Sequence, residues 1–292
     1  MRFLPDLLTL RSHAEETAAT LPGLMIQAEK LADTILHGDH PKRKAGMGEK
    51  FWQYREYVTG DRPQDIDWRQ SAKSDQVFVK QKEWQITRQT FFWCARGQSM
   101  AYRASNERPR KADYAAILVI GLAILLQKSK EHIGLLSEMR TGRSDAMIEK
   151  IGRTVLEQTE DPLPNSAEVS LPKNAYFIGA GDFLSPIEEI AASFHHLFGR
   201  TENALILQIL DPAELSLTYD GRVKFQTMDH SESHVIQNVS SVRDAYEAKI
   251  QAHCRAIQHI CEQQGWTYKL CVTDQPLHSV LHELYAQLDG GV

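Results

Sequence analysis

The sequence predicts an α/β protein with a doubly wound, mostly parallel sheet, preceded by a small, mainly β N-terminal module. Two observations carry this prediction. From residue 88 onward, short apolar runs typical of buried strands alternate with longer segments of helical periodicity. Such alternation requires crossover connections, which place helices on both faces of a parallel sheet. Before residue 88 the strand-like runs are joined by turn residues, so we divide the chain into domains 1–87 and 88–292.

The N-terminal module is expected to begin with a helix over residues 7–36, because apolar residues recur at helical spacing after the breaker Pro22-Gly23. Residues 51–58 have aromatic side chains on both faces, which suits a strand. The turn sequence Gly60-Asp61-Arg62-Pro63 and a weakly alternating second strand over residues 77–84 follow.

The second domain contains an apolar run over residues 114–126, which is too short for a membrane span of about 20 residues and therefore predicts a buried helix. Ser185 can cap the helix that follows it, with Pro186 at the first helical position. The expected strands are 90–94, 132–136, 175–180, 204–210 and 266–272, with a hairpin arm at 223–227. The expected helices are 112–128, 148–158, one starting at 185–186, 246–264 and 276–288.

The composition is that of an ordinary globular protein, with 292 residues, 42% of them hydrophobic and 24% charged, which excludes a collagenous or largely disordered chain. The four cysteines include no CxxC pair and are too few for a disulfide scaffold. Pro5 and Asp6 interrupt any signal-peptide core. We therefore expect a cytoplasmic protein without a membrane span.

Charge is unevenly distributed along the chain. Residues 40–111 carry 16 basic and 8 acidic side chains, which is a net charge of +8. The whole chain has a net charge of −5, so the rest of it carries −13. A basic segment of this kind can bind phosphates or an acidic partner, or the two parts of the chain can attract each other within one fold. Both interpretations remain open at this point.

Three stretches, in this order, resemble one known family. The first comprises Gly46-Met47-Gly48-Glu49-Lys50-Phe51, Arg55-Glu56-Tyr57, Gly60-Asp61 and Asp65-Ile66-Asp67-Trp68-Arg69. The second is residues 92–100, and the third comprises residues 179–184, 211–214, Thr273-Asp274 and Pro276-Leu277. This series is similar to the bacterial "domain of unknown function 58" family, in which the first stretch precedes a von Willebrand factor A-like domain.

The resemblance implies a fold, a function and a class of partner. Proteins of this kind look like non-enzymatic interaction modules that work with MoxR-type AAA+ ATPases in chaperone-like assembly or maturation. The resemblance implies no catalytic activity, and the von Willebrand A-like fold agrees with the doubly wound sheet expected from the strand and helix pattern.

The resemblance also implies where a metal ion would bind, and this sequence departs from it there. The A-domain fold carries an Asp-x-Ser-x-Ser sequence after its first strand, and its oxygen ligands suit Mg²⁺. At these positions this chain has Ala95, Gly97 and Ser99, and Asp182 matches an aspartate of a neighbouring loop. One carboxylate and one hydroxyl are too few ligands, so we expect a degenerate site, no bound Mg²⁺ and no other cofactor.

Partner binding is expected through the Gly60–Arg69 surface and through the carboxyl ends of the strands, where ligands of open α/β sheets bind. The candidate partner-binding residues are Arg55, Asp61, Asp65, Asp67, Trp68, Arg69, Arg96, Ser99 and Asp182. Arg96 either forms an ion pair with Asp182 or points into solvent. In partner binding, Arg96 could hold an acidic protein motif directly, in the way that a bridging metal does elsewhere.

Other patterns have a structural interpretation that we favour. The carboxylates at positions 61, 65 and 67 are expected to accept backbone N–H groups, with Arg55 or Arg69 forming bidentate pairs, rather than to act in acid–base catalysis. Cys254 and Cys261 fall on the core-facing stripe of a helix, which favours packing over zinc binding. A nucleic-acid-binding role for the basic, aromatic-rich segment 40–111 is the alternative function, although acidic residues interleave with its basic ones.

Overall fold

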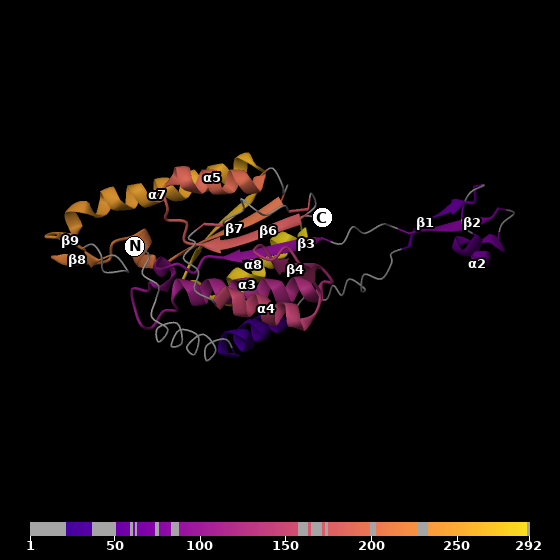
Figure 1. Ribbon diagram of the computed structural model, residues 1–292, viewed down its shortest axis with the longest axis horizontal. Helices are drawn as coiled ribbons and strands as arrows, with labels where there is room; N and C mark the ends of the chain where they lie inside the picture. The colour runs from indigo at the N-terminus through magenta and orange to yellow at the C-terminus, as the bar shows by residue number, and fades with distance from the viewer. Residues whose placement is uncertain are drawn as a thin grey trace, which may run out of the picture. The chain divides into compact units, whose positions relative to one another are not determined.

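A computed structural model describes residues 22–36, 51–58, 61, 63–73, 76–82, 88–156, 163–164, 171–172, 175–198, 203–226 and 233–290. The chain divides into two units (Figure 1). The smaller unit is Gly38–Thr87, and the larger comprises the rest of the chain. Residues 7–21 of the first expected helix, residues 83–84 of the second expected strand and the turn residues Gly60 and Arg62 lie outside the described part.

The larger unit is built on a six-stranded sheet. Its strands, in spatial order, are β10 (Thr267–Val272), β7 (Asn203–Leu210), β6 (Ala175–Gly181), β3 (Gln89–Cys94), β4 (His132–Leu135) and β5 (Thr141–Gly142). Every neighbouring pair is parallel except β4 and β5, which are antiparallel. The doubly wound, mostly parallel sheet is therefore confirmed, and the chain reverses its winding between β3 and β6.

Helices cover both faces of this sheet, as Figure 1 shows. On one face lie α3 (Lys111–Lys128), α4 (Asp145–Leu156) and α8 (Leu277–Gly290); α5 (Ile187–Phe198) and α7 (Ser240–Gln263) lie on the other. Each face encloses its own apolar cluster, the larger around α3 and the smaller around α5 and α7. The central strands are buried on both sides, which explains their continuous apolar sequences.

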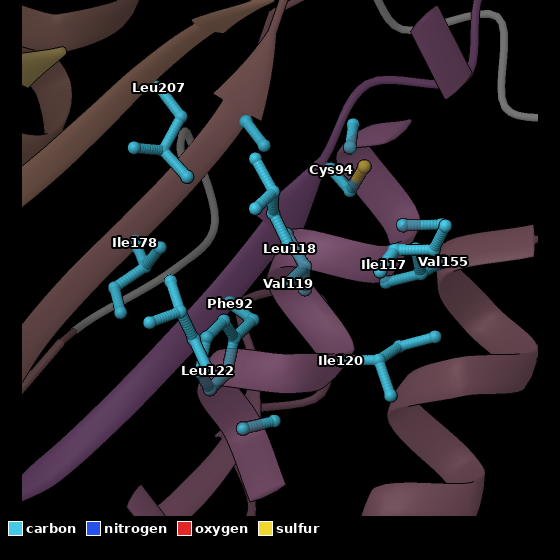
Figure 2. Packing of buried hydrophobic residues seen from close by; sticks show 14 of the residues in the cluster. Phe92, Cys94, Ile117, Leu118, Val119, Ile120, Leu122, Val155, Ile178 and Leu207 are labelled. Carbon is cyan, nitrogen blue, oxygen red and sulfur yellow. The ribbon is translucent and has the colours of Figure 1, made fainter. Parts of the chain in front are cut away.

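Helix α3 is the core element of the larger unit. Its residues from Tyr114 to Leu126 are all buried, in agreement with the apolar run in the sequence. Figure 2 shows Leu118 and Leu122 on the side of the sheet, near Phe92, and Ile117 beside Val155 of α4. A helix that is apolar all round is stable in water only when it is covered on all sides, as α3 is here.

A helix over residues 22–36 packs on the α3 side of the larger unit. Leu24, Ala28 and Ala32 are buried in the same cluster as α3, and Asp33 forms an ion pair with Lys128 at the end of α3. The expected division placed this helix in domain 1–87. Its contacts place it with the α/β unit, because its small apolar side chains complete that unit's core.

The smaller unit contains an antiparallel pair of strands, β1 (Phe51–Glu56) and β2 (Phe78–Lys82), as expected from the sequence. Between them lie a single 3₁₀ turn, η1 (Pro63–Asp65), and a short helix, α2 (Trp68–Ser71). Ile66 forms an isolated bridge to Val79, which is buried at 5% exposure. Val79 is the one buried hydrophobic side chain among the residues of this unit whose exposure the structure describes.

Three short elements complete the larger unit. The 3₁₀ helix η2 (Gln98–Ala101) follows β3, and the one-turn helix α6 (Pro212–Leu215) follows β7. Strands β8 (Val223–Gln226) and β9 (Ser233–Ile236) form an antiparallel hairpin, which confirms the arm expected at 223–227. In the part of the chain that the structure describes, no helix combines the length and apolar character that crossing a membrane requires.

Candidate functional site: an ion cluster at the carboxyl edge of the sheet

Polar side chains gather where four parallel strands end. Strands β3, β6, β7 and β10 run in the same direction, so their carboxyl ends meet at one edge of the sheet. Asp182 follows β6, Asp211 follows β7 and Thr273 follows β10, and all three are buried. Ligands of open α/β sheets bind at this edge, where the strand order reverses.

Lys111 lies at the centre of this group. It is the first residue of α3 and its side chain is fully buried. Its Nζ atom donates to Asp182 Oδ2 at 3.1 Å and to Glu214 Oε1 at 2.6 Å. The same ammonium lies 5.9 Å from the centre of the Tyr102 ring. One cation thus joins the segments that follow β3, β6 and β7.

Glu214 is held in place by its position in α6. The Asp211 side chain accepts from the Ala213 N–H, at 2.9 Å, and from the backbone N–H of Glu214. Glu214 Oε2 in turn accepts from the Asp211 N–H at 2.8 Å, which completes a capping box. One carboxylate oxygen of Glu214 therefore orders the helix start, and the other contacts Lys111. Burial raises the pKa of the Glu214 carboxyl, and the Lys111 ammonium opposes this shift.

Asp211 connects the ion cluster to neighbouring loops. Its Oδ2 accepts from the Ala104 N–H at 3.2 Å and from the Thr273 hydroxyl at 3.5 Å. The Arg108 guanidinium lies 3.7 Å from its Oδ1. Because Asp211 is fully buried, these partners supply the compensation that a buried carboxylate needs.

The tyrosines Tyr102 and Tyr219 lie beside the cluster. Their hydroxyl oxygens are 3.1 Å apart, which joins the loop after β3 to the segment after α6. Burial, together with the hydrogen bond to Tyr219, raises the pKa of Tyr102, so the Tyr102 phenol stays neutral near pH 7. Tyr102 therefore adds a hydrogen-bonding group to the edge without adding charge.

This arrangement does not fit the Mg²⁺ site that the resemblance implies. Ala95 and Gly97 offer no side-chain ligand, and Ser99 offers one half-buried hydroxyl. Asp182, the remaining carboxylate of the expected set, contacts the Lys111 ammonium directly. A metal ion placed there would face a buried positive charge and would have to displace it. Within the described ranges, no three His, Cys, Asp or Glu side chains form a metal-binding group.

Both expected placements of the Arg96 side chain are wrong, whereas its role in partner binding stays a prediction. Arg96 neither pairs with Asp182 nor points freely into solvent. Its guanidinium donates to the carbonyl oxygens of Ala112, at 2.9 Å, and Leu156, at 3.3 Å. These contacts join the start of α3 to the end of α4, so Arg96 positions helices, and Lys111 is the cation that reaches Asp182.

In the smaller unit, the structural interpretation of the signature carboxylates is confirmed for Asp61 and Asp67. The Arg55 guanidinium forms a bidentate pair with Asp61, with both N···O distances at 2.8 Å. Asp61 also accepts from the Val58 N–H, and Asp67 caps α2 by accepting from the Gln70 N–H at 3.0 Å. The side chain of Asp65 lies outside the described part.

The expected partner-binding residues therefore differ in exposure. Trp68 is 67% exposed and Arg69 is also exposed, so both are accessible from solvent. Ser99 is half-buried, whereas Asp182 is 2% exposed and engaged inside the protein. Asp182 can therefore act on a partner only through the structure that it stabilises.

Lys111 was not predicted as a site residue from the sequence, and Glu214 was noted only as part of a motif. One signal was present: a lysine in the first turn of a helix is unfavourable because the positive end of the helix dipole lies there. A lysine that precedes a long apolar run at such a position needs carboxylates nearby. The sequence alone does not say which carboxylates these are.

The cysteines expected in the core are there in part. Cys261 and Cys271 are fully buried and Cys94 nearly so, whereas Cys254 is half-buried. His253, next to Cys254, forms a 2.7 Å hydrogen bond with the Phe183 carbonyl oxygen. Cys261 packs on the α7 face of the sheet, whereas Cys94 and Cys271 pack in the cluster on the α3 face.

The fold and this edge define the class of the protein: a Rossmann-like, doubly wound α/β protein with a buried ion cluster at the carboxyl ends of its strands. Residues 53–256 match the model of the family described as protein of unknown function DUF58, and the chain belongs to that family. An uncharacterized protein of Mycobacterium tuberculosis and one of Mycobacterium bovis are each 23% identical over 263 residues, covering 81% of this chain and 78% of the relative. No solved structure matches the chain significantly.

Proposed function

We propose that the protein is a non-enzymatic, cytoplasmic interaction module with a von Willebrand A-like domain, working with a MoxR-type AAA+ ATPase in chaperone-like assembly or maturation. The resemblance of its sequence stretches to such proteins supports this proposal. In the structure, Ala95, Asp182, Asp211 and Thr273 from these stretches all follow strands that end at one edge of the sheet.

The observation that carries the non-enzymatic part is the internal use of the polar groups at this edge. Lys111, Asp182, Glu214 and Asp211 satisfy one another or cap backbone groups. A general acid or base has to reach a substrate proton within hydrogen-bond distance. Charged groups that are buried and paired in this way suit a rigid platform better than a reacting centre.

The contact surface that we propose lies on the smaller unit. Trp68 and Arg69 are adjacent and exposed at the start of α2, and their residue types are those most enriched among energetically dominant interface residues. Tyr57, Val58 and Val77 of the same unit are also exposed. The neighbouring carboxylates Asp61 and Asp67 hold the turn and the helix cap beneath this surface.

Capture of the ATPase by the full-length, affinity-tagged chain tests this proposal. The bait, either treated beforehand with a chelator of divalent ions or left untreated, is mixed with the purified MoxR-type ATPase of the same organism and with ATP or ADP. We expect the wild-type bait to retain the ATPase whether or not the bait has been treated with chelator. Trp68→Ala and Arg69→Glu should each reduce retention of the ATPase at least tenfold.

The matched control is Arg222→Glu, an equal charge reversal at an exposed arginine of the other unit. It should retain the ATPase as the wild type does. Because the ATPase itself uses Mg²⁺, the chelator is applied to the bait and removed before mixing. Failure of the wild type to retain the ATPase in either nucleotide state would contradict the proposed partnership.

The nucleic-acid alternative predicts a different result. Of the aromatic residues that suggested it, Trp93 packs against Phe183 inside the larger unit, whereas Trp68 and Tyr54 are exposed. Binding to a single-stranded oligonucleotide would weaken steeply as the salt concentration rises, because phosphate contacts release counterions. Salt-sensitive binding that is lost in Trp68→Ala would favour this alternative over the protein partner.

A further inference from the structure

Lys111 is the one lysine that is buried among the residues that the structure describes. Its position is unfavourable in two ways. An ammonium in a protein interior loses its hydration, and the first turn of a helix is the positive end of the helix dipole. Both effects require compensation by negative charge, and Asp182 and Glu214 provide it at 3.1 Å and 2.6 Å.

The carboxylates of Asp182 and Glu214 also depend on Lys111. Asp182 and Glu214 come from two different strand ends, and both are buried or nearly so, with side-chain exposures of 3% and 15%. Two carboxylates that share one buried site repel each other and cannot both stay ionised without a cation between them. The ammonium of Lys111 is that cation, delivered by the chain itself.

We propose that Lys111 is a built-in counter-cation, which does at this edge what a dissociable divalent ion would otherwise do. It follows that Asp182 and Glu214 form a latent cation site. When the lysine side chain is removed, the two carboxylates and the space that it occupied become a site for a hard divalent cation. Carboxylate oxygens are the ligands that such ions prefer, and water completes their coordination.

The inference concerns the ion cluster alone and does not depend on any partner. It also explains why the loop after β3 can lack a carboxylate at position 95 and a hydroxyl at position 97. The lysine at the start of α3 supplies the positive charge, so the loop has only to position the beginning of α3. A hydrogen bond of 3.3 Å from the Lys111 N–H to the Tyr102 carbonyl oxygen joins the loop to the helix.

Manganese binding to the purified full chain tests the proposal. Mn²⁺ is the probe, because free and bound ions are distinguished by electron paramagnetic resonance, and calorimetry supplies the stoichiometry. We expect Lys111→Ala to bind one Mn²⁺ at least tenfold more tightly than the wild type binds any. The double variant Lys111→Ala/Asp182→Asn should lose this site.

Lys128→Ala is the matched control, since Lys128 ends the same helix and its ion pair with Asp33 is exposed. It should resemble the wild type in Mn²⁺ binding. A wild-type Mn²⁺ site that is lost in Asp182→Asn would overturn the proposal. A folded Lys111→Ala variant that gains no site would overturn it as well.

A second measurement covers the case in which Lys111→Ala does not fold. The thermal midpoints of Lys111→Met and of Lys111→Met/Asp182→Asn/Glu214→Gln are compared with that of the wild type. If the ammonium is needed to neutralise the carboxylates, the triple variant melts at a higher temperature than Lys111→Met. A Lys111→Met midpoint equal to or above that of the triple variant would contradict the proposal, whatever the result of the ATPase capture.

Discussion

The Arg55 guanidinium and the Asp61 carboxylate form two parallel hydrogen bonds of equal length, 2.8 Å each, across the turn that follows β1. This pair joins two parts of the family signature, the Arg55-Glu56-Tyr57 stretch and Asp61. The hydrogen bonds from Arg55, followed by that from the Val58 N–H, lower the pKa of Asp61 below its ordinary value. The pair therefore makes the stability of this turn depend on pH.

Asp61→Asn tests this dependence. Because the folded-state pKa of Asp61 is lowered, its contribution is fully present above the ordinary aspartate pKa of about 3.9 and is lost as the pH falls through the folded-state value. We expect the variant to unfold at a lower urea concentration than the wild type at pH 7, with the difference shrinking below about pH 4. Circular dichroism measures the midpoints, and Asp274→Asn, at an exposed site, should match the wild type throughout.

Glu214 predicts the opposite pH trend. Burial raises its folded-state pKa, so its contribution to stability falls as the pH rises above the ordinary glutamate value of about 4.3. Glu214→Ala should cost about 1–3 kcal/mol, because the Asp211 N–H loses its acceptor. Glu214→Gln can keep that acceptor. Its loss in free energy of unfolding relative to the wild type should shrink as the pH rises from 4 towards neutrality. A loss of stability in Glu214→Gln that grows as the pH rises would contradict a raised pKa of Glu214.

Two glycines predict contrasting costs of adding a methyl group. A Cβ atom at Gly134 would lie 2.3 Å from the Arg140 carbonyl oxygen, a backbone atom that cannot move alone. Gly134→Ala should therefore destabilise the protein by about 1–3 kcal/mol or more. At Gly121 of α3 the nearest atom is the Leu281 Cδ2, at 2.8 Å, the end of a side chain that can rotate. Alanine also favours the helix by about 1 kcal/mol, so Gly121→Ala should cost less in a urea titration.

The four cysteines should differ in their reaction with a thiol reagent. Burial raises the pKa of Cys94 to about 11 and the pKa values of Cys261 and Cys271 to about 12 each. Cys254 is half-buried, so Ellman's reagent at pH 8 should modify it first. The fastest phase should disappear in Cys254→Ser, whereas all four thiols react in denaturant. Rapid labelling of Cys261 in the native protein would contradict the structure.

The architecture of the larger unit was predictable because it rests on long, regular signals. Buried parallel strands read as apolar runs, and α3 as an uninterrupted apolar helix, so the alternation was visible without any partner residue. The short elements were missed for the same reason. Strand β5 has two residues and helices α2 and α6 have four each, which is too short for periodicity to develop.

The candidate site was predictable only as a location. The strand ends were identified because ligands of open α/β sheets bind there, and Asp182 because it matches an aspartate of the family that the sequence resembles. The ion pairs themselves were not predicted, because Lys111 lies 71 positions from Asp182 and 103 positions from Glu214 in the sequence. Arg96 was misassigned because its acceptors are carbonyl oxygens at the ends of two helices, and backbone groups leave no trace in a sequence.

The placement of the helix at residues 22–36 has a consequence for how the polypeptide can be cut. Since this helix is anchored in the core around α3, the segment Gly38–Thr87 is an insertion whose two ends both join the same body. A single proteolytic nick within the insertion would leave two fragments that co-elute, with the short one retained by Leu24, Ala28 and Ala32. The segment that carries the family signature can therefore be exchanged between relatives as a unit. Such an exchange would transfer its surface and leave the larger unit folded.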